Sequence, residues 1–133
     1  MGGLQHEEIT KEIIGASYAV ANDLGYNLTE FDYSVAMAIE FKERGLQFIK
    51  EYPAEILYKG KPLRKKKLDF LVEDEVVLEL KVSEFIPKTY IHQVISYLKA
   101  TNLETGLIVC FSKSQVLIKR VINTPEADTT IYP

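Results

Sequence analysis

Three charged residues interrupt two apolar segments in the middle of the chain. Asp69 lies within Leu63 to Val72, and Glu79 and Lys81 lie within Val76 to Val82. An acidic turn between these segments predicts a hairpin that lays Asp69 beside the second strand. Glu79 and Lys81 share a face because side chains alternate along a strand. Two neighbouring carboxylates suit Mg²⁺ or Mn²⁺, and with a lysine they are suited to hydrolysing a phosphate ester.

The same three residues have a simpler interpretation. A strand face that is exposed to solvent often carries a cross-strand salt bridge between a lysine and a carboxylate. The Glu-x-Lys spacing by itself does not distinguish the two readings. The dense apolar surroundings of both strands favour the metal site, because isolated charges are rarely buried without a partner or a metal.

Composition sets the class of protein. The 133 residues are 47% hydrophobic and 26% charged, which is typical of one globular domain spanning residues 1–133. The net charge of −3 gives no overall signature of a nucleic-acid-binding protein. A lone cysteine, Cys110, excludes an internal disulfide and a cysteine-rich zinc site. The chain shows no secretion signal and no membrane-spanning run, so we expect a soluble, cytoplasmic protein without membrane contact.

Hydrophobic periodicity predicts a mixed α/β fold. The expected order is helix (7–24), helix (from Thr29 to Gly45), three strands (46–58, 63–72, 76–82), helix (88–100) and two strands (107–111, 116–122). Thr29 and Asp32 are expected to cap the second helix. Its apolar face is assigned to Phe31, Val35, Ala38 and Ile39. Because a helix connects the third and fourth strands, at least one strand pair should be parallel. The ordered core is expected at about 7–122.

One basic cluster stands out in this acidic chain. Arg64, Lys65, Lys66 and Lys67 lead directly into the strand that carries Asp69. A local patch of this kind can contact the phosphates of a nucleic acid. Lysines also protect the edge of a sheet against unwanted pairing, and both readings stay open. Since side chains alternate along a strand, at most half of the cluster can line one groove.

Most of the chain, from about Ile9 to Ile122, resembles the small prokaryotic GxxExxY proteins of the PD-(D/E)XK nuclease superfamily. The resembling segments are Glu30-Phe31-Asp32-Tyr33, Ala38-Ile39-Glu40, Leu68 to Asp74, Leu78-Glu79-Leu80-Lys81, Gln93 to Leu98 and Ile118-Lys119-Arg120. Two positions depart from the family pattern. Asn27 stands where the family name has its first Gly, and Leu68 precedes Asp69 where Pro is usual.

The resemblance implies a restriction-endonuclease-like core with a mixed central sheet flanked by helices. It implies that Asp69 and Glu79 hold the metal and that Glu30 is a third acidic group. It also implies Lys81 as the catalytic lysine and Gln93 pointing at the site. Glu30 has another explanation, because acids are favoured at the first position of any helix. Tyr33, one turn further along the helix, shares the face of Glu30 and is a secondary candidate.

The expected function is a Mg²⁺- or Mn²⁺-dependent nuclease that hydrolyses phosphodiester bonds, with DNA favoured over RNA. The alternative is a catalytically inactive module that keeps the nuclease fold for binding or as an adaptor. Whether the chain is an enzyme, and whether it forms a homodimer or binds a protein partner, stays open from the sequence.

Overall fold

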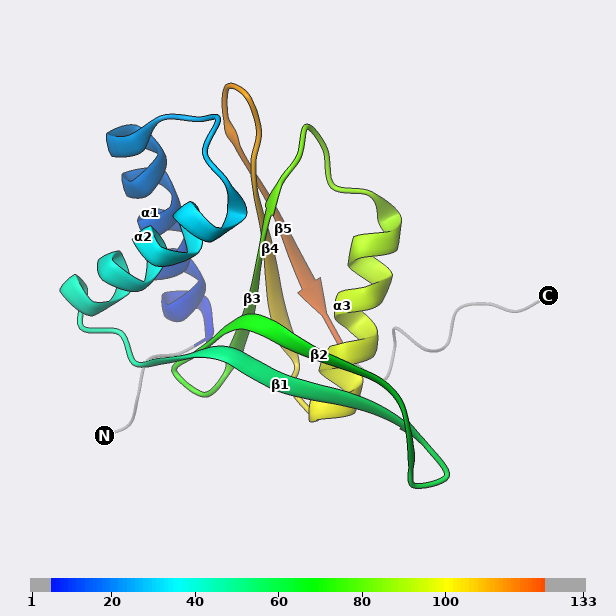
Figure 1. Cartoon of the computed structure of the whole chain (residues 1–133). Helices are drawn as coiled ribbons and strands as arrows, with labels where there is room; N and C mark the ends of the chain where they lie inside the picture. Colours follow the sequence, from blue (N-terminus) through cyan, green and yellow to red (C-terminus); the bar gives the residue numbers. More distant parts are fainter. Residues whose placement is uncertain (1–5, 124–133) are drawn as a thin grey trace.

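The computed structural model describes residues 6–123, and the helices and strands follow the expected order (Figure 1). The elements are α1 (His6–Leu24), α2 (Glu30–Glu43), β1 (Phe48–Tyr58), β2 (Lys61–Val72), β3 (Val76–Val82), α3 (Lys88–Thr101), β4 (Thr105–Phe111) and β5 (Val116–Ile122). The strand bounds predicted for β3 and β5 are confirmed. The tail from residue 124 onward lies outside the described residues. No helix within residues 6–123 combines the length and the apolar character needed to cross a membrane.

A five-stranded sheet in the order β1-β2-β3-β4-β5 forms the centre of the fold. The β3–β4 pair is parallel and is joined through α3, whereas the other neighbours are antiparallel. Helices α1 and α2 pack on one face of the sheet and α3 packs on the other (Figure 1). The prediction of a mixed sheet flanked by helices is confirmed, and each face has its own apolar core.

Helix α2 begins at the predicted capping box. The Thr29 hydroxyl accepts a hydrogen bond from Asp32 N at 3.1 Å, and the Asp32 carboxylate accepts one from Thr29 N at the same distance. Asn27, just before the cap, has a φ of 77°. This left-handed conformation is one that Gly adopts freely and Asn tolerates, so the Asn27 departure is a mild one.

The predicted apolar face of α2 is wrong. Phe31, Val35 and Ile39 are exposed, whereas the buried side chains are Tyr33, Met37 and Phe41. Both sets have helical spacing, so periodicity alone could not choose between them. The buried face has aromatic partners in the sheet: Tyr33 stacks on Phe111 and Phe41 packs edge-on against Phe70. Among the described residues, the exposed Phe31 has no such aromatic partner.

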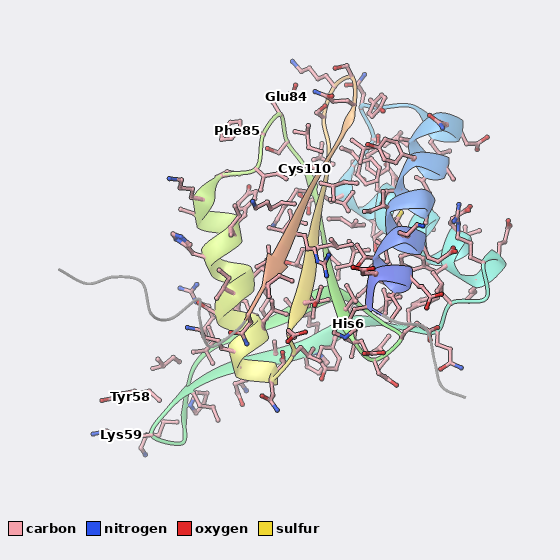
Figure 2. All side chains as sticks on the ribbon, turned by 180° about the vertical axis from the view of Figure 1, so that it is seen from behind. His6, Tyr58, Lys59, Glu84, Phe85 and Cys110 are labelled. Carbon is pink, nitrogen blue, oxygen red and sulfur yellow. The ribbon has the colours of Figure 1, made fainter. Side chains whose placement is uncertain are left out.

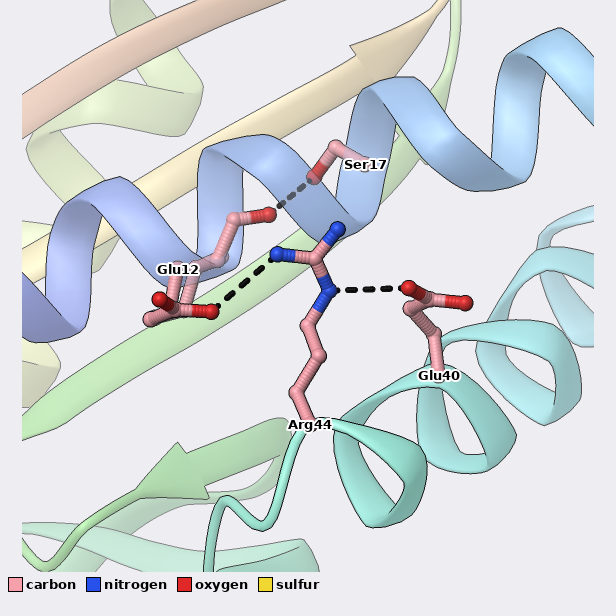
Figure 3. Close-up of polar contacts among 5 residues, drawn as sticks. Glu12, Ser17, Glu40 and Arg44 are labelled. Carbon is pink, nitrogen blue, oxygen red and sulfur yellow. Dashed lines mark hydrogen bonds and ion pairs between the residues drawn. The ribbon is translucent and has the colours of Figure 1, made fainter.

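An arginine fixes α2 against α1 (Figure 3). Arg44 donates to Glu40 through Nε at 2.8 Å and to Glu12 through Nη1 at 3.1 Å. A Cβ placed on Gly15 would lie 2.9 Å from Arg44 Nη1, so a larger residue there would displace the guanidinium. The contact joins the C-terminal end of α2 to α1.

Strands β1 and β2 change faces part-way along their length. The pairs Lys50–Phe70 and Tyr52–Leu68 flank an interruption of the ladder, where Glu51 has a φ of 55°. Phe70 belongs to the core under α1 and α2, whereas Leu68 belongs to the core under α3. Two residues this far apart would share a face in a regular strand. The reversal therefore falls at Asp69.

Candidate active site

Two carboxylates lie at the point where β2 and β3 separate. Backbone pairing between these strands ends at Phe70 and Leu78. Beyond that pair, side chains take over: Asp69 N donates to Glu79 Oε1 at 2.8 Å, and Leu80 N donates to Asp69 Oδ2 at 2.7 Å. Each carboxylate thus bonds the backbone of the opposite strand. The hairpin brings Asp69 and Glu79 together, as the sequence predicts.

The two carboxylates are held in an environment that opposes their negative charge. Glu79 is only 3% exposed, and Asp69 is half-buried. Burial, followed by the charge of Glu79, raises the pKa of Asp69 to about 6. Charged groups out of water require compensation by a cation or by hydrogen bonds. A positive charge at this place would relieve the repulsion between the two carboxylates.

Lys66 supplies one such charge. Its Nζ lies 3.1 Å from Glu79 Oε2, and its side chain is about one-third exposed, at 34%. Burial is the largest single effect and acts to lower the pKa of Lys66. The charge of Glu79, its hydrogen bond and the charge of Asp69 act the other way, and the pKa is raised overall. Strict alternation would place Lys66 on the same side as Phe70, away from Glu79. The reversal at Asp69 turns it inward, and no pattern in the sequence signals that reversal.

Lys81 and Gln93 line a small pocket together with Glu79 and Lys66. Its free volume is about 10 Å³, which is close to the space that one water molecule needs. Lys81 Nζ lies 4.6 Å from the centre of the Tyr90 ring, a cation–π distance. The side chains of Tyr90, Val94, Tyr97 and Ile108 complete the wall. Sequence reasoning missed the two tyrosines, since their helical spacing with Val94 and Leu98 looks like ordinary packing.

Glu30 reaches the end of β3 from α2. Its Oε2 accepts a hydrogen bond from Val82 N at 3.4 Å, and the residue is exposed. Burial raises the pKa of the Cys110 thiol to about 11, while Lys81 acts to lower it and Glu30 to raise it. The contact with Val82 N, the residue after Lys81 in β3, places Glu30 at the Lys81 end of the sheet. Within residues 6–123, however, no three His, Cys, Asp or Glu side chains gather closely enough to hold a metal ion.

Tyr33 has a structural place in the described fold. It is fully buried, its hydroxyl donates to Gly25 O at 2.8 Å, and its ring stacks on Phe111 at 3.9 Å between centroids with 3° between planes. Tyr33 therefore joins α2 and the loop before it to β4. Since Glu30 lies one turn earlier on α2, this packing also positions Glu30.

The lysines of the basic cluster on the β1–β2 hairpin take different ion-pair partners, although three of its four residues line one groove. Lys65 pairs with Glu55 at 3.6 Å and Lys67 pairs with Glu51 at 3.8 Å, whereas Lys66 turns toward Glu79. A groove of about 640 Å³ is lined by Pro53, Ala54, Glu55, Lys65, Lys66 and Lys67. Arg64 is exposed and does not line it.

The hairpin extends past α3 to a projecting tip at Tyr58 and Lys59 (Figure 2). The groove is therefore a surface feature of a projecting hairpin, and Lys66 lines both the groove and the small pocket. Cross-strand ion pairing and a lysine-lined groove coexist here, so the structure keeps both readings of the basic cluster.

Comparison with known proteins places the chain in a family. The model of the PD-(D/E)XK nuclease superfamily matches residues 7–121. No curated protein matches the chain. The fold is similar to the crystal structure of SSO0001, with a TM-score of 0.57 and 18% identity, covering 92% of this chain and 60% of that one. It is also similar to the alkaline exonuclease LHK-Exo from Laribacter hongkongensis, with a TM-score of 0.50 and 18% identity.

The second match covers 68% of this chain and 54% of the exonuclease, so the chain spans less than two thirds of the length of either protein. At this identity the two structures establish the fold, and the family model establishes the ancestry of the whole described core. The chain belongs to the PD-(D/E)XK nuclease superfamily.

Proposed function

We propose that the protein is a divalent-metal-dependent nuclease that hydrolyses phosphodiester bonds in nucleic acid. The observation that carries the proposal is the Asp69–Glu79 pair at the strand separation, with Lys81 and Gln93 beside Glu79 in a pocket the size of one water. Membership of the nuclease superfamily supports the same reaction class. The Glu30-x-x-Tyr33 spacing further supports a place among its GxxExxY proteins.

The residues present fit a Mg²⁺ or Mn²⁺ ion. Both ions prefer carboxylate oxygens, and Asp69 and Glu79 supply them from neighbouring strands. Burial and the charge of Glu79 raise the pKa of Asp69 even with Lys66 nearby, so a divalent cation beside the pair would be favourable. Asp69 and Glu79 would hold the metal, and Glu30 would complete the set only after moving from Val82 N. When bound, the metal would offset negative charge on the phosphate.

The remaining side chains act on water and substrate. Lys81 has three N–H donors, which can orient the attacking water or hold a phosphate oxygen. Gln93, on the same pocket wall, can fix Lys81 or that water by a hydrogen bond. In the reaction, the water oxygen would form a bond to phosphorus as the bond to the leaving sugar oxygen breaks, and the proton lost by the water would balance the one taken up by the leaving oxygen. The lysine-lined groove would carry the phosphate backbone, with DNA tested ahead of RNA.

A second candidate function has an observation of its own. Lys66 already compensates Glu79 by an ion pair, which is the arrangement expected of a nuclease fold retained for binding or as an adaptor. Such a module would use the groove without cutting. It would bind nucleic acid or a protein partner equally well with and without divalent metal.

A cleavage assay separates the two functions. Purified protein is incubated with DNA and with RNA in Mn²⁺, beside Asp69→Ala, Lys81→Ala and a sample containing EDTA. The nuclease proposal expects degradation by the wild type alone, and only with metal. Nucleic acid that stays intact in every sample, or that is cut equally by all three proteins, would refute the proposal.

A further inference from the structure

Among the described residues, the Lys66–Glu79 contact is the ion pair in the candidate site. Glu79 is 3% exposed, and Lys66 is the one cation within ion-pair distance of it among residues 6–123. A buried carboxylate without a counter-charge would be costly. Lys66 is therefore not only a surface lysine. It neutralises one of the two carboxylates proposed to bind metal.

Lys66 also lies between the small pocket and the lysine-lined groove. It lines the small pocket with Glu79, Lys81 and Gln93, and it lines the groove with Lys65 and Lys67. Its side chain keeps 34% exposure, so the ammonium has water on one side and the carboxylate on the other. A lysine side chain has a flexible four-carbon stem. A change of rotamer could move the charge from the pocket to the groove.

We propose that Lys66 is a displaceable counter-ion of the Asp69–Glu79 pair. A divalent cation replaces it on Glu79, because a doubly charged ion and an ammonium repel each other when they share one carboxylate. The released ammonium turns to the groove and contacts a phosphate of the bound strand. Metal binding thereby strengthens phosphate binding, and by linkage phosphate binding strengthens metal binding. The inference rests on the proposed function for the identity of the bound strand.

Metal affinity supplies the first test. Mn²⁺ is titrated calorimetrically into the wild type, Lys66→Met, Lys66→Gln and the control Lys65→Met. Lys65 belongs to the same strand but pairs with Glu55. Loss of the competing charge should tighten Mn²⁺ binding by about tenfold in both Lys66 variants, and leave the control unchanged. Lys66→Gln keeps a neutral donor toward Glu79, so it guards against misfolding of Lys66→Met. Equal or weaker Mn²⁺ binding in both Lys66 variants would overturn the inference.

Oligonucleotide affinity supplies the second test. Here the Lys66 variant should lose an effect of Mn²⁺, whereas in the first test it gains Mn²⁺ affinity. It is measured with and without Mn²⁺ in the Lys81→Ala background, so that the strand stays intact. Mn²⁺ should increase the affinity of the parent several-fold, and Lys66→Met should lose this increase although it binds Mn²⁺ more tightly. Lys65→Met should weaken binding equally with and without metal. An increase retained in Lys66→Met would overturn the inference.

These readouts do not depend on turnover. Tighter Mn²⁺ binding in the Lys66 variants, with nucleic acid left uncut by the wild type, would support the counter-ion and refute the nuclease. If the wild type cut nucleic acid but the Lys66 variants bound Mn²⁺ no more tightly, the nuclease proposal would be supported and the counter-ion inference refuted.

Discussion

Replacing Asp69 by Asn is expected to raise the melting temperature of the metal-free protein at about pH 8 while removing its affinity for Mn²⁺. Asn can still accept the hydrogen bond from Leu80 N that Asp69 Oδ2 now accepts at 2.7 Å. It carries no charge that burial or the neighbouring Glu79 would destabilise. We expect a gain of roughly 4 °C, which corresponds to about 1 kcal/mol of unfolding free energy. A functional site often trades stability for activity, so removing its charge can stabilise the fold while abolishing ligand binding.

The pH dependence of this gain follows from the pKa of Asp69. Its value is about 6 in the folded protein, against an ordinary 3.8. Between these values the folded state holds a proton that the unfolded state has lost, so wild-type stability falls as pH rises through this window. The advantage of Asp69→Asn should therefore be absent below the ordinary pKa, grow through the window and be complete above about pH 6.

Thermal melts in EDTA across this range, with Mn²⁺ titrations at neutral pH, measure both effects. Asp74→Asn is the matched control, because Asp74 lies exposed in the β2–β3 turn with a φ of 59°, which Asn also tolerates. The control should leave Mn²⁺ affinity unchanged. A lower melting temperature for Asp69→Asn above pH 6, with Mn²⁺ binding intact, would show that the two carboxylates neither repel each other nor bind metal.

Replacing Lys81 by Ala is expected to reduce the rate of cleavage by at least about 10²–10³-fold with little change in stability. Lys81 is half-buried, and its contact with the Tyr90 ring at 4.6 Å is worth about 0.5–1 kcal/mol. Glu79 keeps its pairing with Lys66 in this variant. Removing Lys81 should thus take away a donor to water or phosphate while the fold and the carboxylate pair remain.

Single-turnover cleavage with excess protein, together with a thermal melt and a Mn²⁺ titration, measures this prediction. Lys119→Ala is the control, since Lys119 is an exposed strand lysine on β5. The control should cut at the wild-type rate. If Lys81→Ala cleaved nucleic acid at the wild-type rate, another group would perform the role assigned to Lys81. Lys66 would then be the first residue to test.

The hairpin that carries the site could be predicted because several local signals agree. Both strands are apolar runs, and a short polar turn joins them. The turn residues Glu73 and Asp74 adopt the positive φ values of 53° and 59° that such turns accommodate. Once the turn is fixed, register places Asp69 beside Glu79. The pairing of the two carboxylates is thus a consequence of sequence-local structure.

Lys66 could not be predicted in the same way, because its position depends on an irregularity. A positive φ at Glu51, in the neighbouring strand, accompanies the reversal that turns Lys66 toward Glu79. Neither residue has a sequence signature for this. The prediction of the buried face of α2 was wrong for a related reason. Whether Phe31 or Tyr33 is buried depends on Phe111, which lies far along the chain.

Anomalous diffraction from a crystal soaked in Mn²⁺ tests the central claim most directly. The account predicts a manganese peak between the carboxylates of Asp69 and Glu79, with Lys66 Nζ withdrawn from Glu79 toward the groove. Absence of a peak at saturating Mn²⁺, with Lys66 still paired to Glu79 as it is now at 3.1 Å, would contradict a metal-dependent site at these residues.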